Sequence, residues 1–524
     1  MGLVALGGFF LVLAAVLTVY GWLNNHRLTR LPQAAVAFSP QRITPDSVRK
    51  LAAKLEKLPP ITIKEQLPPK TGRRYIVVGG GGFLGGWIVA SLLERGEDPK
   101  GIRILDIRPP VREDLMSAQT RGVQFMQVDV SDAAAVEAAF NASWPAAITL
   151  PGGTLPELTV FHTAANIRFY ERHETFLPHS EKVNVLGTEN VVNSARSAGA
   201  SILIYTSSGS VAVRRSRFFL WLWETEPKYF VQVITDDENA LPKRHDEFFS
   251  NYAATKMRAD RLVRAADKSP SGPGAGVLRT GCIRPGNGVF GPRGDMLCGA
   301  YLVRRTNPTW IANTMQSFCY VENCALAHLC YEQRLAELQA GGTNPDIGGQ
   351  AFVVADPGPI PTYGDVYRTL ETLTEGECTF PELPPTLMLL VATIIEWYYV
   401  GRQLLINGGY AIGKMLPPID GDLVNLQPSL FALTSVHLVF DDSRARLPPE
   451  KGGLGYEGAW TTFEGLHKTV EEHRNGVGRA GRRSDLAGVS LGFGMGRAQH
   501  AVAEANDKVV DGLGVDPVKI LSTK

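Results

Sequence analysis

The sequence predicts the α/β class, with a doubly wound parallel sheet that helices cover on both faces. Short apolar segments alternate with helical segments between residues 75 and 283, and the first apolar segment runs into a glycine-rich turn. The apolar segments also lack the polar alternation that is typical of strands with one solvated face. Nearly continuous apolar strands are expected where both faces of a parallel sheet are buried.

Strands alternate with helices until the alternation weakens near residue 290, except that no helix is expected between the second and third strands. We expect strands at 75–80, 102–107, 123–128, 158–163, 202–206, 277–283 and 350–354. We expect helices at 83–95, 132–140, 182–198 and 251–266. Residues 71–300 are therefore assigned to the sheet domain and 301–474 to a smaller C-terminal region that is expected to bind the substrate. Residues 475–524, which are rich in Gly, Arg and Ala, are expected to form a flexible tail.

The composition of the 524-residue chain excludes some classes of protein. Lys and Arg number 53 and Asp and Glu 52, so the formal net charge is +1. A protein that binds nucleic acid through a strongly basic surface is excluded, and we expect no nucleic-acid partner. The six cysteines form no CxxC pair, which predicts buried, reduced thiols and neither a disulfide framework nor a metal site.

The N-terminus predicts a membrane segment. No residue from 2 to 25 is charged, and about 21 helical residues already cross a ~30 Å hydrocarbon core. A cleaved signal peptide is the alternative, but it would need a basic stretch before the apolar run. Arg27 and Arg30 follow the run, which predicts a single-pass anchor at 1–25 with the rest of the chain in the cytosol. Residues 26–70, with a short helix at 46–58 between prolines, are expected to form a stalk.

A second uncharged run covers residues 383–395, within a hydrophobic segment at 383–400. Thirteen residues are too few to span a bilayer. Two interpretations stay open: a helix buried in the core, or a helix that lies in the membrane surface beside a lipid-binding mouth.

Three glycines follow the first strand with the spacing G-x-x-G-x-x-G. They are Gly79, Gly82 and Gly85, with Phe83 and Leu84 between the last two. Glycine permits a tight turn and lets backbone N–H groups approach a pyrophosphate, while the next helix directs its N-terminus at the negative charge. This pattern predicts a Rossmann-type dinucleotide site.

Asp106 ends the second strand, 21 residues after Gly85. A carboxylate at this position accepts hydrogen bonds from the adenosine ribose hydroxyls and repels a 2′-phosphate, which favours NAD over NADP. Arg108 could bind a 2′-phosphate instead, so NADP stays open. Asp129 at the end of the third strand could reach the adenine edge, or could belong to a helix N-cap region with Ser131 and Asp132.

Ser208, Tyr252 and Lys256 are the candidate catalytic residues. Ser208 follows the fifth strand, where open α/β sheets bind ligands, and the spacing of four puts Tyr252 and Lys256 on one face of a helix. A phenol with a pKa near 10 is a poor base at neutral pH, but a nearby ammonium and a positively charged nicotinamide would lower that pKa. Ser208 would then hydrogen-bond the oxygen of the reacting alcohol, and Lys256 could hold the nicotinamide ribose.

These motifs resemble the extended short-chain dehydrogenase/reductases. The chain is most similar to the branch of 3β-hydroxysteroid dehydrogenases and sterol-4α-carboxylate 3-dehydrogenases. The matching stretches are 79–85, 161–165, 184–191, 205–208, 252–256, 283–292, 320–323 and 454–456.

The resemblance implies roles for individual residues. Ser208 corresponds to the catalytic serine, Tyr252 to the general acid/base and Lys256 to its partner. The cofactor-binding residues that it implies are Gly79, Gly82, Phe83, Leu84, Gly85, Asp106, Asp129, Ala164, Ala165, Tyr252, Lys256 and Pro285. Asn184 would support the active site from its helix.

The resemblance also implies a function. We expect a membrane-anchored, NAD-dependent dehydrogenase of the endoplasmic reticulum that oxidises the 3β-hydroxyl of a lipophilic, sterol-like substrate. A second copy of the chain, in a homodimer, is a candidate partner. If the substrate carries a carboxylate at C4, oxidation yields a β-keto acid that loses CO₂. Arg168, Arg172 and Arg293 are candidates for binding that carboxylate. An NADPH-dependent reductase of another carbonyl compound and a non-catalytic NAD-binding membrane scaffold are the alternatives.

The sequence departs from the family pattern between Ser208 and Tyr252. This stretch is longer than expected and carries aromatic clusters at 218–223 and 229–230. The clusters could face a sterol or a membrane surface, or they could pack on a small core of their own.

Overall fold

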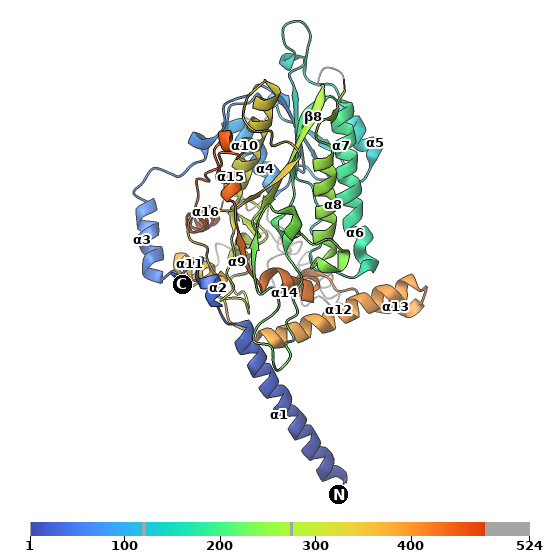
Figure 1. Ribbon diagram of the computed structural model, residues 1–524, viewed down its shortest axis with the longest axis vertical. Coiled ribbons are helices and arrows are strands. Elements are labelled where there is room, and N and C mark those ends of the chain that lie inside the picture. Colours follow the sequence, from blue (N-terminus) through green and yellow to red (C-terminus); the bar gives the residue numbers. More distant parts are fainter. Residues whose placement is uncertain (1, 118–121, 273–275, 477–524) are drawn as a thin grey trace, which may run out of the picture.

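The computed structural model describes residues 2–117, 122–272 and 276–476 (Figure 1). A parallel sheet lies at its centre, in the order β11-β8-β5-β4-β1-β2-β3. The strands are β1 (Arg74–Val78), β2 (Ile102–Asp106), β3 (Gln124–Gln127), β4 (Leu158–His162), β5 (Ala200–Thr206), β8 (Val277–Pro285) and β11 (Gln350–Val354). The short β7 (Ser269–Pro270) pairs antiparallel with β8. The predicted doubly wound parallel sheet is confirmed.

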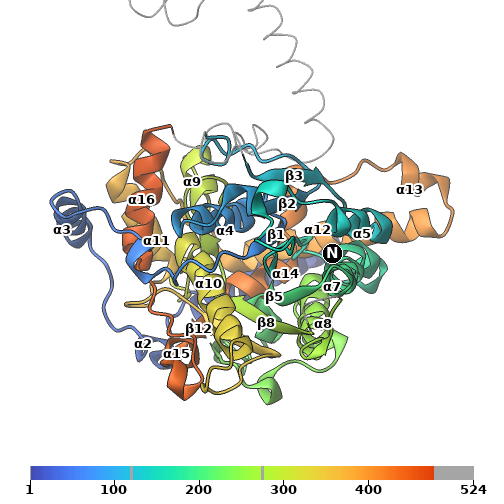
Figure 2. The same cartoon turned by 90° about the horizontal axis from the view of Figure 1, so that it is seen from above.

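Helices cover both faces of the sheet. Figure 2 shows α4 (Phe83–Glu94) and α10 (Val321–Gln339) on one side of β5 and β8, and α7 (Gly187–Ser197) and α8 (Asn251–Ala265) on the other. The α5 helix (Ala133–Asn141) packs beside α7. All residues of β1, β4 and β5 are buried, as their continuous apolar sequences predict.

The smaller C-terminal region is joined to the sheet domain and does not form a separate body. Its strand β11 pairs with β8, and its helix α10 covers the sheet. The remaining strands are β6 (Val231–Ile234), β9 (Val289–Phe290), β10 (Cys319–Tyr320) and β12 (His437–Phe440). Residues 218–230, which carry both aromatic clusters, are called the aromatic insertion below. Strand β6 directly follows this insertion and pairs with β12, and β9 pairs with β10. The other helices of this region include α9 (Cys298–Arg304), α11 (Tyr363–Leu373), α14 (Pro428–Thr434), α15 (Ser443–Arg446) and α16 (Thr462–Arg474).

The aromatic insertion is partly buried and partly exposed. One part packs in a core and the other faces outward, so each of the two interpretations from the sequence describes one part. Phe218 and Leu220 are buried in a cluster that also contains Leu389 and Phe431. The next three residues, 221–223, are exposed, and the rings of Trp221 and Trp223 stack 5.4 Å apart. The buried part therefore belongs to a shared core, and the tip of the turn faces outward.

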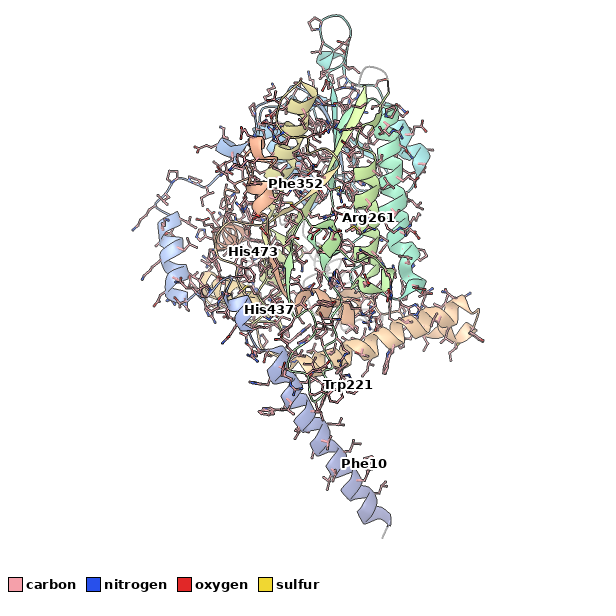
Figure 3. All side chains as sticks on the ribbon, viewed as in Figure 1. Phe10, Trp221, Arg261, Phe352, His437 and His473 are labelled. Carbon is pink, nitrogen blue, oxygen red and sulfur yellow. The ribbon has the colours of Figure 1, made fainter. Side chains whose placement is uncertain are left out.

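The N-terminal helix α1 (Gly2–Leu28) projects from the foot of the body (Figure 1) and is a candidate for crossing a membrane by length and composition. Its apolar side chains between residues 9 and 22 are largely exposed, as Phe10 shows in Figure 3. Its root is fixed to the insertion, because Asn24 Nδ2 donates to the Phe218 carbonyl at 3.1 Å and Arg27 donates to the carbonyls of Trp221 and Leu222.

The second apolar segment forms a longer helix than its uncharged run predicts. Helix α12 spans Pro385–Asn407, or 23 residues, and continues through Glu396 and Arg402; by length and composition it is also a candidate span. The prediction that this segment is too short to span a bilayer therefore fails, because it counted only the uncharged residues. One face of α12 packs on the body, while the opposite face is exposed. Helix α12 and the short α13 (Ala411–Met415) extend sideways from the foot of the body (Figure 1).

Residues 26–70 pack against the body, although the sequence predicts a stalk. They contain α2 (Gln33–Val36) and α3 (Pro45–Leu55), and α3 contacts α11. Arg42 forms an ion pair with the buried Asp365, whose other oxygen accepts the Ile43 N–H at 3.0 Å. Ile63 is buried in the main core. The predicted tail at 475–524 lies outside the described residues, except for 475 and 476. All six cysteines are buried and free, as predicted.

Candidate active site

The glycine turn joins β1 to α4 and requires glycine at two positions. Gly79 has φ +82°, and a Cβ on it would lie 2.6 Å from Thr163 Oγ1 and 2.7 Å from Ala164 N. A Cβ on Gly85 would lie 2.2 Å from the Gly79 carbonyl oxygen. Gly82 is the N-cap of α4, which begins at Phe83 and continues with Leu84. The turn therefore brings backbone close to the loop after β4 and opens a helix at the carboxyl edge of the sheet.

Asp106 ends β2 beside this turn, as the sequence predicts. Its Oδ2 accepts the Gly81 N–H at 3.0 Å, and its Oδ1 accepts the Arg108 N–H at 3.4 Å. Burial raises the pKa of Asp106, and these backbone hydrogen bonds oppose the rise. The side chain of Arg108 is exposed. The carboxylate is therefore tied to the glycine turn and keeps acceptor capacity for a ribose.

Asp129 and the two alanines lie on loops at the same edge of the sheet, after β3 and β4 respectively. Asp129 is exposed, and its Oδ1 accepts the Ser131 N–H at 2.9 Å and the Ser131 hydroxyl at 2.7 Å. The N-cap of α5 is Asp132, so Asp129 stabilises the turn that precedes this helix. Ala164 and Ala165 follow β4 and are half-buried, and Ala164 is the residue that closely approaches Gly79.

Ser208 and Tyr252 are neighbours at the ends of β5 and α8. Ser208 caps the short helix Gly209–Ala212, and its hydroxyl lies 2.7 Å from that of Ser210. Tyr252 is half-buried in the first turn of α8, whose N-cap is Ser250. Burial raises the pKa of Tyr252, and a hydrogen bond with the Ser208 side chain opposes the rise. The serine and phenol that the sequence pairs are therefore brought together.

Lys256 lies one turn after Tyr252 and is almost completely buried. Its Nζ donates to the Thr206 carbonyl at 2.6 Å and lies 4.2 Å from the centre of the Tyr205 ring. Burial lowers the pKa of Lys256 to about 7, and the nearby Cys282 and Asp260 oppose this. The ammonium is thus anchored to the end of β5. The expected lowering of the Tyr252 pKa by Lys256 is not seen, since burial is the dominant influence on the phenol.

Asn184 connects α8 to the loop after β4. It is fully buried in a π-helical turn, Lys182–Leu186, that precedes α7. Its Oδ1 accepts the Asn166 N–H at 2.8 Å, and its Nδ2 donates to the Asn166 carbonyl and to Thr255 Oγ1, each at 3.1 Å. Such π turns often occur at functional sites. Asn184 therefore fixes the loop that carries Ala164 and Ala165 relative to α8.

Pro285 is the last residue of β8 and is buried. The next N–H, of Gly286, donates to the Val354 carbonyl at 2.7 Å, and Asn287 Nδ2 donates to the Leu433 carbonyl at 3.2 Å. The chain after Pro285 thus passes between β11 and α14.

The sequence did not reveal a hydrogen bond between Thr206 and His328 at the end of β5. The Thr206 hydroxyl lies 2.7 Å from His328 Nε2, and His328 Nδ1 lies 2.7 Å from the Cys324 carbonyl oxygen. His328 is on α10, more than 100 residues from Thr206, so no local spacing could have indicated the pair. This contact holds the end of β5, where Lys256 is anchored.

The three arginines considered for a substrate carboxylate are already paired within the chain. Arg168 binds Glu171, and Arg172 forms a bidentate ion pair with Glu396 of α12. Arg293 binds Asp114 and Glu472. None of the three therefore presents an unpaired guanidinium to a ligand.

Comparison with known proteins identifies a family and several relatives. Residues 76–377 match the sequence model of the 3-beta hydroxysteroid dehydrogenase/isomerase family. The 3beta-hydroxysteroid-dehydrogenase/decarboxylase isoform 2 of Arabidopsis thaliana is 28% identical over 417 residues, which are 77% of this chain and 62% of that relative. The match thus spans less than two thirds of that relative's length.

Two further comparisons are with a bacterial relative and with a solved structure. The 3 beta-hydroxysteroid dehydrogenase/Delta 5→4-isomerase of Mycobacterium tuberculosis is 26% identical over 75% of this chain and 88% of its own length. The solved structure of a UDP-glucose 4-epimerase from Thermotoga maritima aligns with a TM-score of 0.50 at 17% identity, over 77% of this chain and 99% of the epimerase. At this identity the epimerase shows a shared fold.

Proposed function

Because the chain belongs to the 3-beta hydroxysteroid dehydrogenase/isomerase family, we propose that it is a membrane-anchored, NAD-dependent dehydrogenase that oxidises a secondary alcohol of a lipophilic, sterol-like substrate. The observation that carries the proposal is the pairing of Ser208 with Tyr252 one helical turn from Lys256, at the edge of the sheet that also holds the glycine turn. A phenol, a hydroxyl and an ammonium at this edge are the groups that alcohol oxidation needs.

The residues around the glycine turn fit a dinucleotide. The turn leaves no room for a Cβ at Gly79 or Gly85, so backbone can lie against a pyrophosphate at the start of α4. Asp106 offers its carboxylate to the adenosine ribose, and Asp129 and Ala164 lie on the loops after β3 and β4. When bound, NAD supplies the hydride acceptor for the oxidation.

Two side chains of this protein accept the substrate proton and orient the alcohol. The Tyr252 phenolate accepts the proton of the substrate hydroxyl, and Ser208 hydrogen-bonds the same oxygen as it becomes a carbonyl oxygen. Lys256, held by the Thr206 carbonyl, places a positive charge on the Tyr252 side of the helix and can also hold a ribose hydroxyl.

The family and the exposed apolar side chains at the foot of the body support the proposed substrate class. The Arabidopsis relatives are named dehydrogenase/decarboxylases. We include decarboxylation in the proposal for substrates with a carboxylate at C4, because a 3-ketone beside that group makes a β-keto acid. A panel of 3β-hydroxysterols and other lipophilic alcohols, assayed with NAD and NADP separately, tests the proposal. Reduction of NADP alone, or only carbonyl reduction with NADPH, would favour the reductase alternative.

The Asp106 carboxylate should determine the choice between NAD and NADP. Replacing Asp106 with Ser removes the acceptor for the ribose hydroxyls and the charge that repels a 2′-phosphate. Because a hydrogen bond to a charged group contributes ~1.5–3 kcal/mol, we expect the kcat/KM ratio of NAD to NADP to fall by roughly tenfold or more. Steady-state kinetics with both cofactors measures this ratio. An unchanged ratio would show that Asp106 does not contact the ribose.

Helix α1 is proposed to be the membrane anchor, with the catalytic body on the cytosolic side and the endoplasmic reticulum as its location. Deleting residues 2–19 keeps Asn24 and Arg27, which fix the root of the helix to the body. We expect the full chain to remain in the membrane pellet after an alkaline carbonate wash and the shortened chain to be released. A shortened chain that resists the wash would assign integral anchoring to α12 instead.

A further inference from the structure

A cleft of about 620 Å³ lies at the foot of the body, between α12, α14 and the aromatic insertion. Its volume is in the range of ~300–1,000 Å³ that is typical of small-molecule sites. One part of its wall is apolar, and the residues of that part are Phe218, Phe219, Phe249, Leu389, Pro428 and Ala432. The cleft can therefore bury a lipophilic body.

The rest of the wall contains four arginines, and three of them are engaged. Arg172 is neutralised by Glu396, and Arg217 pairs with Glu224. Arg214 donates to the Ala240 carbonyl at 2.8 Å and lies over the Tyr229 ring. The acidic residues of the wall are engaged too, because Asp246 pairs with Arg244 and Glu247 accepts the N–H of Lys243 at 2.8 Å.

Arg215 differs from the other three arginines. Within the described parts of the chain its guanidinium has no hydrogen-bond or ion-pair partner, although its backbone N–H donates to the Glu247 carbonyl at 3.3 Å. Arg215 is an exposed residue of the cleft wall. Partial desolvation and the nearby positive charge of Arg172 lower the pKa of Arg215, while Glu396 and Asp246 oppose this. Among the four arginines of the cleft, Arg215 is thus the one whose guanidinium has neither a hydrogen-bond nor an ion-pair partner in the described residues, and an anionic group could bind it.

The cleft borders both proposed catalytic segments. The segment after Ser208 pairs with the segment before Tyr252 through an antiparallel bridge between Arg214 and Phe248, which holds Arg215 beside this junction. Phe249 lines the cleft three residues before Tyr252. A molecule in the cleft therefore lies against the chain segments that lead into the active site.

The cleft also borders the exposed apolar surface of the foot. Leu389 and Thr393 of α12 line it, while Leu390, Ile394 and Trp397 of the same helix are exposed. The exposed Trp221, at the root of α1 in Figure 3, follows the cleft-lining Phe218 and Phe219. If α1 lies in a bilayer, a lipophilic molecule can reach the cleft along this surface without crossing water.

We infer that this cleft binds an amphipathic ligand with a lipophilic body and one anionic group, and that the unpaired guanidinium of Arg215 binds that group. The ligand class rests on the proposed function, whose substrate is lipophilic. The anionic group can belong to an acidic substrate or to a phospholipid headgroup, and both carry oxygen atoms that a guanidinium binds.

Two binding measurements on the full-length protein in a neutral detergent separate these sources. The first compares a 3β-hydroxysterol carboxylic acid with its methyl ester, and the second compares short-chain phosphatidylserine with phosphatidylcholine. In at least one pair we expect the wild type to bind the anionic ligand about tenfold or more tightly. Arg215→Gln should abolish this preference and leave the neutral ligand unaffected, while Arg215→Lys should keep part of it.

Arg258→Gln is the matched control, because Arg258 is an exposed arginine of α8 that pairs with Glu181 away from the cleft. It should keep the full preference. Loss of the preference in the sterol pair assigns the site to an acidic substrate, and loss only in the phospholipid pair assigns it to a headgroup. No anion preference in either pair, or equal weakening of acid and ester by Arg215→Gln, would overturn the inference. Since binding is measured without turnover, an Arg215-dependent preference in a protein that oxidises no sterol would reject the proposed function alone.

Discussion

Tyr252→Phe is expected to lower kcat for NAD-linked alcohol oxidation by about 10²–10⁴-fold, the usual contribution of a positioned general base. The substitution removes only the phenolic oxygen, which is the atom that accepts the substrate proton. The ring stays in the first turn of α8, and the glycine turn that would hold the pyrophosphate is on a different element. NAD affinity should therefore change by less than about threefold. Single-turnover kinetics and NAD titration measure the two quantities.

Ser208→Ala provides a graded comparison for this result. It removes the hydrogen bond that stabilises the ionised phenol and orients the substrate oxygen, but it leaves the base in place. We expect a smaller loss of kcat than for Tyr252→Phe. If the Phe variant oxidises alcohols as fast as the wild type, Tyr252 is not the base. A wild type that binds NAD but turns over no alcohol would favour the scaffold alternative.

Gly85→Ala is expected to abolish measurable NAD binding. The new Cβ would lie 2.2 Å from the Gly79 carbonyl oxygen and 2.8 Å from Thr163 Oγ1, so α4 and the glycine turn would have to move apart. That movement withdraws the backbone N–H groups and the start of the helix from the pyrophosphate. We expect the NAD dissociation constant to rise by about 100-fold or more, which is about 2.7 kcal/mol of binding free energy.

Gly86→Ala is the matched control on the next residue of the same helix. The three atoms nearest to its Cβ would all belong to the Arg112 side chain, the closest at 2.9 Å, so the close contact is with a side chain and not with the backbone of the glycine turn. Alanine also has a higher helix propensity than glycine. NAD binding should persist in this variant. Equal NAD affinity in the Gly85 and Gly86 variants would show that the cofactor does not bind at this turn.

The sheet could be predicted because burial on both faces leaves a strong signal in the sequence. Strand β5, for example, reads ASILIYT and is buried at every residue. Helix α10 could not be predicted in the same way. It is buried around most of its surface, including Glu332, so it lacks the polar face that reveals a helix by its period. Glu332 is tolerated there because it pairs with the buried Arg95, a contact between distant parts of the chain.

The site was predictable where its residues occur in local motifs and unpredictable where it depends on long-range contacts. The turn at Gly79, the carboxylate of Asp106 and the spacing of Tyr252 and Lys256 are all local. Two contacts join residues that are far apart in the sequence, so no local motif indicates them. They are the hydrogen bond from Lys256 to the Thr206 carbonyl and the ion pair of Arg172 with Glu396 of α12. For the same reason, no local motif indicates that Arg215 would remain unpaired.

The pH dependence of NADH formation from a 3β-hydroxysterol tests the central claim most directly. Oxidation needs Tyr252 in its deprotonated form, and burial raises the pKa of this phenol. The fraction of active base therefore grows as the pH rises, and kcat/KM for oxidation should increase from about pH 7 to about pH 10 in the wild type. Tyr252→Phe should show no such increase. A rate of sterol oxidation that is independent of pH, or the same rise in the Phe variant, would contradict the account.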